Sequence, residues 1–295
     1  MAPIAQQRDL QPHREPLYFR HLFYIDRTRQ YMVQRLFSFS CRAITLLGAL
    51  TAAVMTSMAT AASEPRIVCS NIAPFVYEQQ GSPTGYAYEI GLEVMKRLHY
   101  KGQIKVEPLP RANRTVQSEA NVIALWLGRI PERERTVTWI HPIFSDDFSI
   151  YTLKNKHGAA TIEQAQKLDM LGANIGAANA IAAQRKGLTQ IELITSDDAN
   201  GRKLMTGRID GWIATESSVK FFLQLHALPS DSFIKGLKLS DYQAWVAASP
   251  ATDPAIIAQW QKTLADMQRD GTLARLASKY RVNLLNSYQG QQSMK

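Results

Sequence analysis

The feature that most restricts the fold of this chain is an alternation of short apolar runs with stretches of helical periodicity along residues 66–280. Runs such as 67–69 and 122–127 are uninterrupted and short, which is typical of buried strands. Between such runs, residues like Ile90 and Val94 recur at a spacing that places them on one face of a helix. The alternation predicts an α/β fold with mostly parallel sheets.

Length, charge and cysteine content exclude several classes of function. The chain has 295 residues, which is enough for two domains that each bury a core. Its net charge is +9, but no basic stripe with interleaved aromatic residues is present, and we expect no nucleic-acid partner. Cys69 lies in an apolar run, which predicts a buried and inert thiol. No spaced group of His or Cys is present, and we expect neither a metal site nor a cofactor.

Residues 32–61 have the pattern of a secretory signal. Two arginines precede the apolar segment 43–58, and Ala59-Thr60-Ala61 supplies an A-x-A cleavage site. The apolar segment is shorter than the roughly 20 residues that a membrane-spanning helix needs, although an uncleaved anchor remains an alternative. We therefore expect residues 1–62 to be an N-terminal extension plus a signal peptide that begins at about residue 32, and we expect a periplasmic protein.

A charged turn at residues 129–135 directly follows the predicted strand 122–127. Arg133 stands there between two glutamates, just past the strand, where rigid scaffolds often place ligand-binding side chains. A guanidinium can bind a carboxylate through two parallel hydrogen bonds. The same residues also suit a solvated turn in which the three arginines pair with the two glutamates, and the spacing leaves both interpretations open.

Four motifs occur in a fixed order along residues 65–280. They are Pro74-Phe75-Val76-Tyr77 with Gly85-Tyr86 after it, Pro131-Glu132-Arg133 followed by Trp139 and Pro142, Gly207-Arg208-Ile209-Asp210, and Asp270-Gly271 continuing to Lys279-Tyr280. In this order the motifs resemble those of the periplasmic solute-binding proteins of family 3, the amino-acid-type receptors of ABC importers.

This resemblance implies the two-lobed periplasmic-binding-protein fold of type II, in which each lobe is a mostly parallel sheet flanked by helices. Two hinge strands, near residues 149–153 and 242–247, would make the first lobe discontinuous. The expected segments are the first part of lobe one (63–150), lobe two (151–241), and the second part of lobe one with the C-terminal helices (242–295).

The resemblance also implies that Arg133 binds the carboxylate of a ligand between the lobes, outside the carboxyl ends of the strands. Phe75, Tyr77 and Trp126 are candidate apolar or stacking walls, although each of them also suits a hydrophobic core. Arg111 precedes a helix and is either a second guanidinium at the cleft or an ordinary surface arginine.

The amino-acid pocket of the family is only partly present in this sequence. The position whose acidic residue usually binds the ligand's ammonium group holds Thr215, so its neighbour Glu216 is the candidate for that role. The helix entrance that usually offers hydroxyl groups to the ligand reads Ala-Ile-Ala at 180–182. Asn179, which precedes it, is a further candidate ligand-binding residue.

The leading hypothesis is a monomeric, non-enzymatic binding protein that captures a small carboxylate-bearing solute, such as an amino acid. It would deliver this ligand to an inner-membrane ABC permease or to a membrane sensor. One alternative is a dehydratase-like periplasmic enzyme on the same scaffold, with Glu216 as its acid or base. Another is an orphan sensory receptor.

Overall fold

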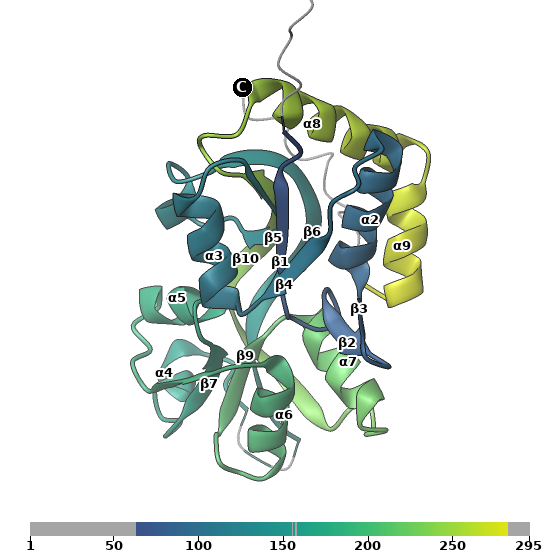
Figure 1. Ribbon diagram of the computed structural model, residues 1–295. Coiled ribbons are helices and arrows are strands. Elements are labelled where there is room, and N and C mark those ends of the chain that lie inside the picture. The colour runs from purple at the N-terminus through teal and green to yellow at the C-terminus, as the bar shows by residue number, and fades with distance from the viewer. Residues whose placement is uncertain (1–62, 155, 157, 283–295) are drawn as a thin grey trace, which may run out of the picture. The chain divides into compact units, whose positions relative to one another are not determined.

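The structure is a computed structural model that describes residues 63–154, 156 and 158–282 (Figure 1). The described residues belong to one compact unit. The expected signal segment and its cleavage site lie outside them. Within the described ranges, no helix has both the length and the apolar character that are needed to cross a membrane.

A single eight-stranded sheet organises the chain, with the strand order β4-β1-β5-β10-β6-β9-β7-β8. Two long strands, β6 (Thr138–Leu153) and β10 (Phe233–Ala248), pair antiparallel at its centre. Lobe one contains the parallel strands β1 (Arg66–Ser70), β4 (Ile104–Glu107) and β5 (Val122–Gly128). Lobe two contains the parallel strands β7 (Leu171–Asn174), β8 (Ile191–Ile194) and β9 (Gly211–Ala214). The expected parallel sheets are therefore present in each lobe, while the strands that join the lobes are antiparallel.

Helices cover both faces of the sheet in lobe one (Figure 1). The helix α3 packs against β1, β4 and β5 on one face, while α2 packs against β4 and β5 on the other, together with α8 and α9. The bounds are α2 (Tyr86–Leu98), α3 (Leu109–Ser118), α8 (Pro254–Arg269) and α9 (Thr272–Tyr280). A small hairpin of β2 (Tyr77–Gln79) and β3 (Ser82–Thr84) precedes α2.

Lobe two has short helices whose starts follow from local capping. The helices are α4 (Ile162–Ala165), α5 (Ala178–Arg185), α6 (Asp197–Met205) and α7 (Glu216–Leu225). Ser196 caps α6 and Thr215 caps α7, since each side-chain oxygen accepts a hydrogen bond from a backbone N–H three residues later. Thr161 and Gln164 form a capping box, but the helix α4 that they begin has only four residues.

Residues 174–177 read as a strand in the sequence, but β7 ends at Asn174, because Gly176 has a φ of +75° and the chain turns there. The hinge strands expected near 149–153 and 242–247 are the ends of two strands of 16 residues each. Because these long strands pass through both lobes, the sheet connects the lobes directly.

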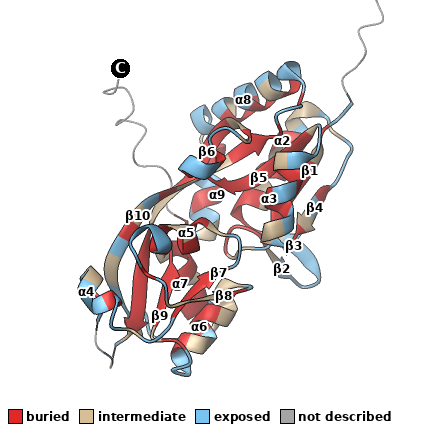
Figure 2. Ribbon diagram, turned by 90° about the vertical axis from the view of Figure 1, so that its left-hand side faces the viewer, coloured by how far each residue is buried: buried red, intermediate tan, exposed pale blue. Residues whose placement is uncertain are grey.

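The core is formed by the strands and by the inward faces of the helices, while the exposed residues lie mainly on the outer helix faces (Figure 2). Ile90 and Val94 are fully buried on α2, as their spacing predicts. Cys69 is also buried, and this burial, with a smaller effect of Glu107, raises the pKa of its thiol to about 12. The thiol is therefore protonated at neutral pH and unreactive, as expected from the sequence.

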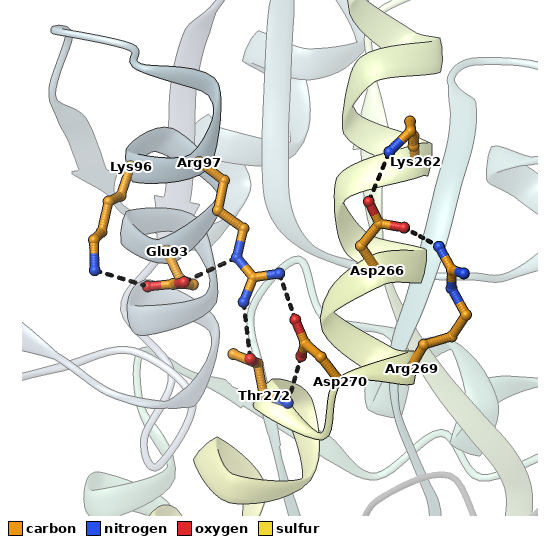
Figure 3. A network of polar contacts seen from close by, with 8 residues as sticks. All are labelled: Glu93, Lys96, Arg97, Lys262, Asp266, Arg269, Asp270 and Thr272. Atoms are coloured by element: carbon orange, nitrogen blue, oxygen red, sulfur yellow. Dashed lines mark hydrogen bonds and ion pairs between the residues drawn. The ribbon is translucent and has the colours of Figure 1, made fainter.

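A polar network joins α2 to the turn between α8 and α9 (Figure 3). Arg97 donates to Glu93 of its own helix, to Asp270 over 2.7 Å and to Thr272 over 2.9 Å. Hydrogen bonds from Thr272, followed by the one from Arg97, hold the pKa of the Asp270 carboxyl at about 2. Asp270 thus connects two parts of lobe one that are far apart in the sequence.

We expect Asp270→Asn to lower the midpoint of thermal unfolding at pH 7 slightly, by at most about 3 °C, because the network is exposed. The pKa of Asp270 is depressed in the folded state, so its stabilisation is complete above the unfolded pKa of roughly 4 and is lost as the pH falls through about 2. The difference between variant and wild type should therefore shrink below pH 4. The control Asp266→Asn should change the midpoint less, since its partners Lys262 and Arg269 belong to the same helix. Equal midpoints for wild type and Asp270→Asn at pH 7 would contradict this role.

Candidate functional site

Arg133 ends a short 3-10 turn, Pro131–Arg133, immediately after β5, and its side chain is directed into the protein. Only 8% of the residue is exposed. Its guanidinium donates to the carbonyl oxygen of Gly128 over 3.0 Å and to that of Gly176 over 3.1 Å. Gly128 ends a strand of lobe one and Gly176 follows a strand of lobe two, so this one side chain spans the two lobes.

The two interpretations of the charged turn apply to different arginines. Arg129 pairs with Glu134 over 2.9 Å, and Arg185 pairs with Glu132, so a solvated surface turn describes these residues. Arg133 takes part in no ion pair with the described residues, and its remaining N–H groups can still donate. Burial lowers the pKa of Arg133, against smaller opposing effects of Tyr242 and Glu132, but a guanidinium stays charged. Arg133 is thus a buried cation without an anionic partner.

Arg133 lines a small cavity, which we call the central cavity, at the carboxyl ends of strands from both lobes. Its volume is about 40 Å³, which is room for only a few water molecules. Its walls combine apolar, aromatic and polar side chains. They are Ile72, Phe75, Leu109, Trp126, Gly128, Arg133, Phe148, Asn174, Gly176, Ala177, Ala178, Asn179, Asp197, Ala214, Thr215, Ser218 and Tyr242.

The lobes meet at this cavity. Asn113 of α3 donates to the same carbonyl oxygen of Gly176 that Arg133 binds, over 2.9 Å. Gly176 is therefore held by two side chains of lobe one. A solute the size of an amino acid does not fit into about 40 Å³, so its binding requires that the lobes separate or that it extends beyond the central cavity.

Three of the other residues selected from the sequence lie at the central cavity. The rings of Phe75 and Trp126 stack with centroids 3.9 Å apart, and both residues line the cavity while belonging to the main core. Both residues thus belong to the core and also reach the cavity wall. Asn179 also lines the cavity, but its amide is used internally, donating to the Ile213 carbonyl and accepting from the Ala180 N–H, each over 2.8 Å.

The structure does not bring the remaining three residues to the central cavity. Arg111 is exposed on α3, which fits the surface alternative. Glu216 is the first residue of α7, where it forms ion pairs with Lys220 one turn later and with Lys235. The hydrogen bond from Lys220 is the main reason that the pKa of Glu216 is lowered. Tyr77 lies elsewhere, with its ring centroid 5.0 Å from that of Phe221.

Tyr77 lines a second and larger space, which we call the side pocket. Its volume is about 400 Å³, and it shares the lining residues Ile72, Asp197 and Ser218 with the central cavity. Its lining comes from β2 and the chain before it in lobe one and from α6 and α7 in lobe two. The residues are Asn71, Ile72, Ala73, Tyr77, Glu78, Gln79, Ser196, Asp197, Asp198, Ser218, Phe221, Phe222 and Leu225. In the described part of the chain, no group of three or more His, Cys, Asp or Glu is placed to hold a metal ion.

Sequence reasoning missed Asp197, which lines both spaces. Ser196 and Asp197 both stand at the start of α6, but it is Ser196 that accepts the capping hydrogen bond. The Asp197 carboxylate instead accepts from the Asn174 amide over 2.9 Å and from the Ser218 hydroxyl over 3.1 Å. Its position just past the carboxyl end of β8 is the signal that could have identified it.

Comparison with known proteins agrees with this architecture. A profile of the bacterial extracellular solute-binding proteins, family 3, matches residues 67–283. The chain belongs to this family. A search of curated proteins finds no match. The residues that carried the resemblance in the sequence, from Phe75 to Tyr280, all lie within the matched region.

Solved structures of the two-lobed type are similar to this family 3 protein over 73–74% of the chain. An ancestral arginine-binding protein bound to arginine has a TM-score of 0.64 at 16% identity, with 98% of that chain covered. An ancestral amino acid-binding protein, a precursor of cyclohexadienyl dehydratase, has a TM-score of 0.65 at 18% identity, with 95% covered. A histidine kinase sensor domain with similarity to periplasmic binding proteins has a TM-score of 0.64 at 14% identity, with 95% covered. At these identities the comparison establishes the fold.

Proposed function

We propose that this protein is an exported, monomeric substrate-binding protein of the periplasm that closes its lobes on a small carboxylate-bearing solute, such as an amino acid. The observation that carries the proposal is Arg133, a buried cation at the junction of the lobes that forms no ion pair with the residues that the structure describes. A ligand carboxylate would supply the missing negative charge, through charge-assisted hydrogen bonds to the guanidinium N–H groups. Family membership supports a role in solute binding.

Closure of the lobes would couple binding to a partner in the membrane. In the proposed cycle the segments 63–150 and 242–295 form lobe one, 151–241 forms lobe two, and the central strands bend to open the cleft. The closed form would then be recognised by an inner-membrane ABC permease. A membrane sensor is the second candidate partner, since one similar structure is the sensor domain of a histidine kinase.

An enzyme on this scaffold is the alternative that the comparisons suggest, because one similar protein is a precursor of a dehydratase. The alternative requires an acid or base at the cleft, and Glu216 was the residue considered for it. Glu216 lies outside both spaces and is neutralised by two lysines. Glu216 is therefore not placed to act as this acid or base, and membership in a solute-binding family favours binding without catalysis.

A thermal-shift screen of the mature protein against amino acids, polyamines and organic acids tests the proposal. We expect at least one carboxylate-bearing solute to raise the unfolding temperature, because a ligand that binds only the folded state stabilises it by mass action. The solute should also reduce the radius of gyration in small-angle scattering, since it favours the closed form. Stabilisation without any carboxylate-bearing hit would contradict the proposal, and chemical turnover of the hit would favour the enzyme.

A further inference from the structure

The side pocket shares part of its wall with the central cavity, and its lining is acidic and aromatic. We propose that Asp197 and the side pocket bind a positively charged group of the ligand, so that the solute carries both a carboxylate and a cation on an extended chain. This inference rests on the proposed function, because it assigns the other end of the ligand whose carboxylate meets Arg133.

The charges around the side pocket favour a cation. Glu78, Asp197 and Asp198 line it, whereas no lysine or arginine does. Asp198 is already neutralised, since its carboxylate accepts from Arg202 over 2.8 Å and contacts the ring nitrogen of His226 over 2.6 Å. Asp197 differs from its neighbour because the groups that donate to its carboxylate, the Asn174 amide and the Ser218 hydroxyl, are uncharged. Among the described side chains, none forms an ion pair with Asp197. A ligand cation would therefore compensate a carboxylate that the protein leaves unpaired.

The aromatic lining suits the same type of group. Tyr77 of lobe one and Phe221 of lobe two contact each other at the side pocket, and Phe222 also lines it. The faces of aromatic rings attract guanidinium and ammonium groups, and this attraction is larger when the group is withdrawn from water. The pocket thus combines one unpaired carboxylate with apolar walls, as expected for a site that binds an organic cation rather than a hydrated metal ion.

The dimensions of the two spaces explain why the ligand should be extended. The central cavity, at about 40 Å³, has little more room than a carboxylate needs, whereas the side pocket offers about 400 Å³. Asp197 belongs to the wall that the two spaces share. A chain that starts at Arg133 can therefore pass Asp197 and place its charged end in the side pocket.

Asp197 replaces Glu216 as the acidic residue of the site. Glu216 was the choice from sequence because it adjoins Thr215, but its carboxylate is directed to Lys220 and Lys235. Thr215 does line the central cavity, where its hydroxyl accepts the capping hydrogen bond from the Ser218 N–H. The acidic role has thus moved from the start of α7 to the start of α6.

Ionisation of Asp197 should make cation binding depend on pH. Burial raises the pKa of the Asp197 carboxyl to about 6, against the effects of its hydrogen bonds. The carboxyl is thus neutral well below pH 6 and charged above it, so binding of a permanent cation should strengthen as the pH rises through about 6. The titratable groups that face this region are Tyr77 and Glu78 of β2, Asp198 of α6, His226 after α7, and Tyr242 of β10, the last beside Arg133.

Titration calorimetry at pH 7.5 with L-arginine, L-citrulline and agmatine tests the inference. Arginine and citrulline have the same chain length and differ in the charge of the terminal group, while agmatine keeps the cation and lacks the carboxylate. We expect wild type to bind arginine at least about tenfold more tightly than citrulline, which corresponds to about 1.4 kcal/mol. Asp197→Asn, which keeps the size of the side chain, should remove this preference. Glu216→Gln and the surface control Asp266→Asn should leave it unchanged.

A pH series provides a second measurement, which stays informative even if Asp197→Asn lowers the stability of the protein. Arginine should bind wild type several-fold more weakly at pH 5 than at pH 7.5, and Asp197→Asn should reduce this dependence. A dependence that persists unchanged in the variant would overturn the role of Asp197.

Other outcomes separate this inference from the proposed function. The inference would be overturned if wild type bound arginine and citrulline with equal affinity, or if it bound neither arginine nor agmatine. The proposed function would still hold if a purely anionic solute bound in an Arg133-dependent way. If Glu216→Gln abolished the preference and Asp197→Asn did not, the acidic role would return to Glu216.

Discussion

Alanine in place of Arg133 is expected to weaken binding of a carboxylate-bearing solute by roughly thirty-fold to several thousand-fold, or about 2–5 kcal/mol. The substitution leaves the ligand's charge buried without a partner. It also removes the donors to the carbonyl oxygens of Gly128 and Gly176, which reduces the contacts that hold the lobes together. Calorimetry with the tightest carboxylate-bearing hit of the thermal-shift screen measures the change.

Two further variants separate the charge of Arg133 from its geometry. Arg133→Lys should restore binding only in part, because an ammonium group cannot reproduce the planar fork of a guanidinium. Arg129→Ala is the matched control, since Arg129 lies on the same turn and pairs with Glu134 at the surface. The control should leave the affinity unchanged. Equal binding by wild type and Arg133→Ala would remove the basis of the site assignment.

Replacement of Gly85 by alanine should lower the free energy of unfolding by about 2–5 kcal/mol, because backbone strain and overpacking act together. Gly85 precedes α2 with a φ of +121°, a conformation that L residues rarely adopt. An added Cβ would lie 2.5 Å from the carbonyl oxygen of Phe75, which accepts a hydrogen bond from the Ala87 N–H. The clash would displace Phe75 and, with it, the ring that stacks on Trp126 at the central cavity.

Gly81→Ala is the matched control for this prediction. Gly81 also has a positive φ, of +77°, but no atom lies within 4 Å of the position of an added Cβ. Backbone strain alone should then lower the free energy of unfolding by about 1–2 kcal/mol. Urea denaturation measures the stability of both variants. Similar midpoints for Gly81→Ala and Gly85→Ala would show that the close contact with Phe75 adds no destabilisation.

The sequence by itself determined the fold class and the family. The alternation of apolar runs and helical periodicity is a local property of the chain, so the strands around Val68 and Leu125 and the helix that carries Ile90 could be predicted. Arg133 could be selected because it follows a strand, and the carboxyl ends of parallel strands meet at one edge of a sheet. The motifs then identified the family before any contact was known.

The tertiary structure decided which charged residues line the central cavity. Arg129 and Arg133 lie on the same charged turn after β5, but Arg129 pairs with Glu134 at the surface while Arg133 is directed to the junction of the lobes. Glu216 and Asp197 are both acidic residues near the start of a helix, and only the packing shows that lysines neutralise the first while neutral donors surround the second. The physical reason is that the charge state of a site depends on partners from distant parts of the chain. A local sequence pattern does not show these partners, because the partner residues come together only when the two lobes fold on the central strands.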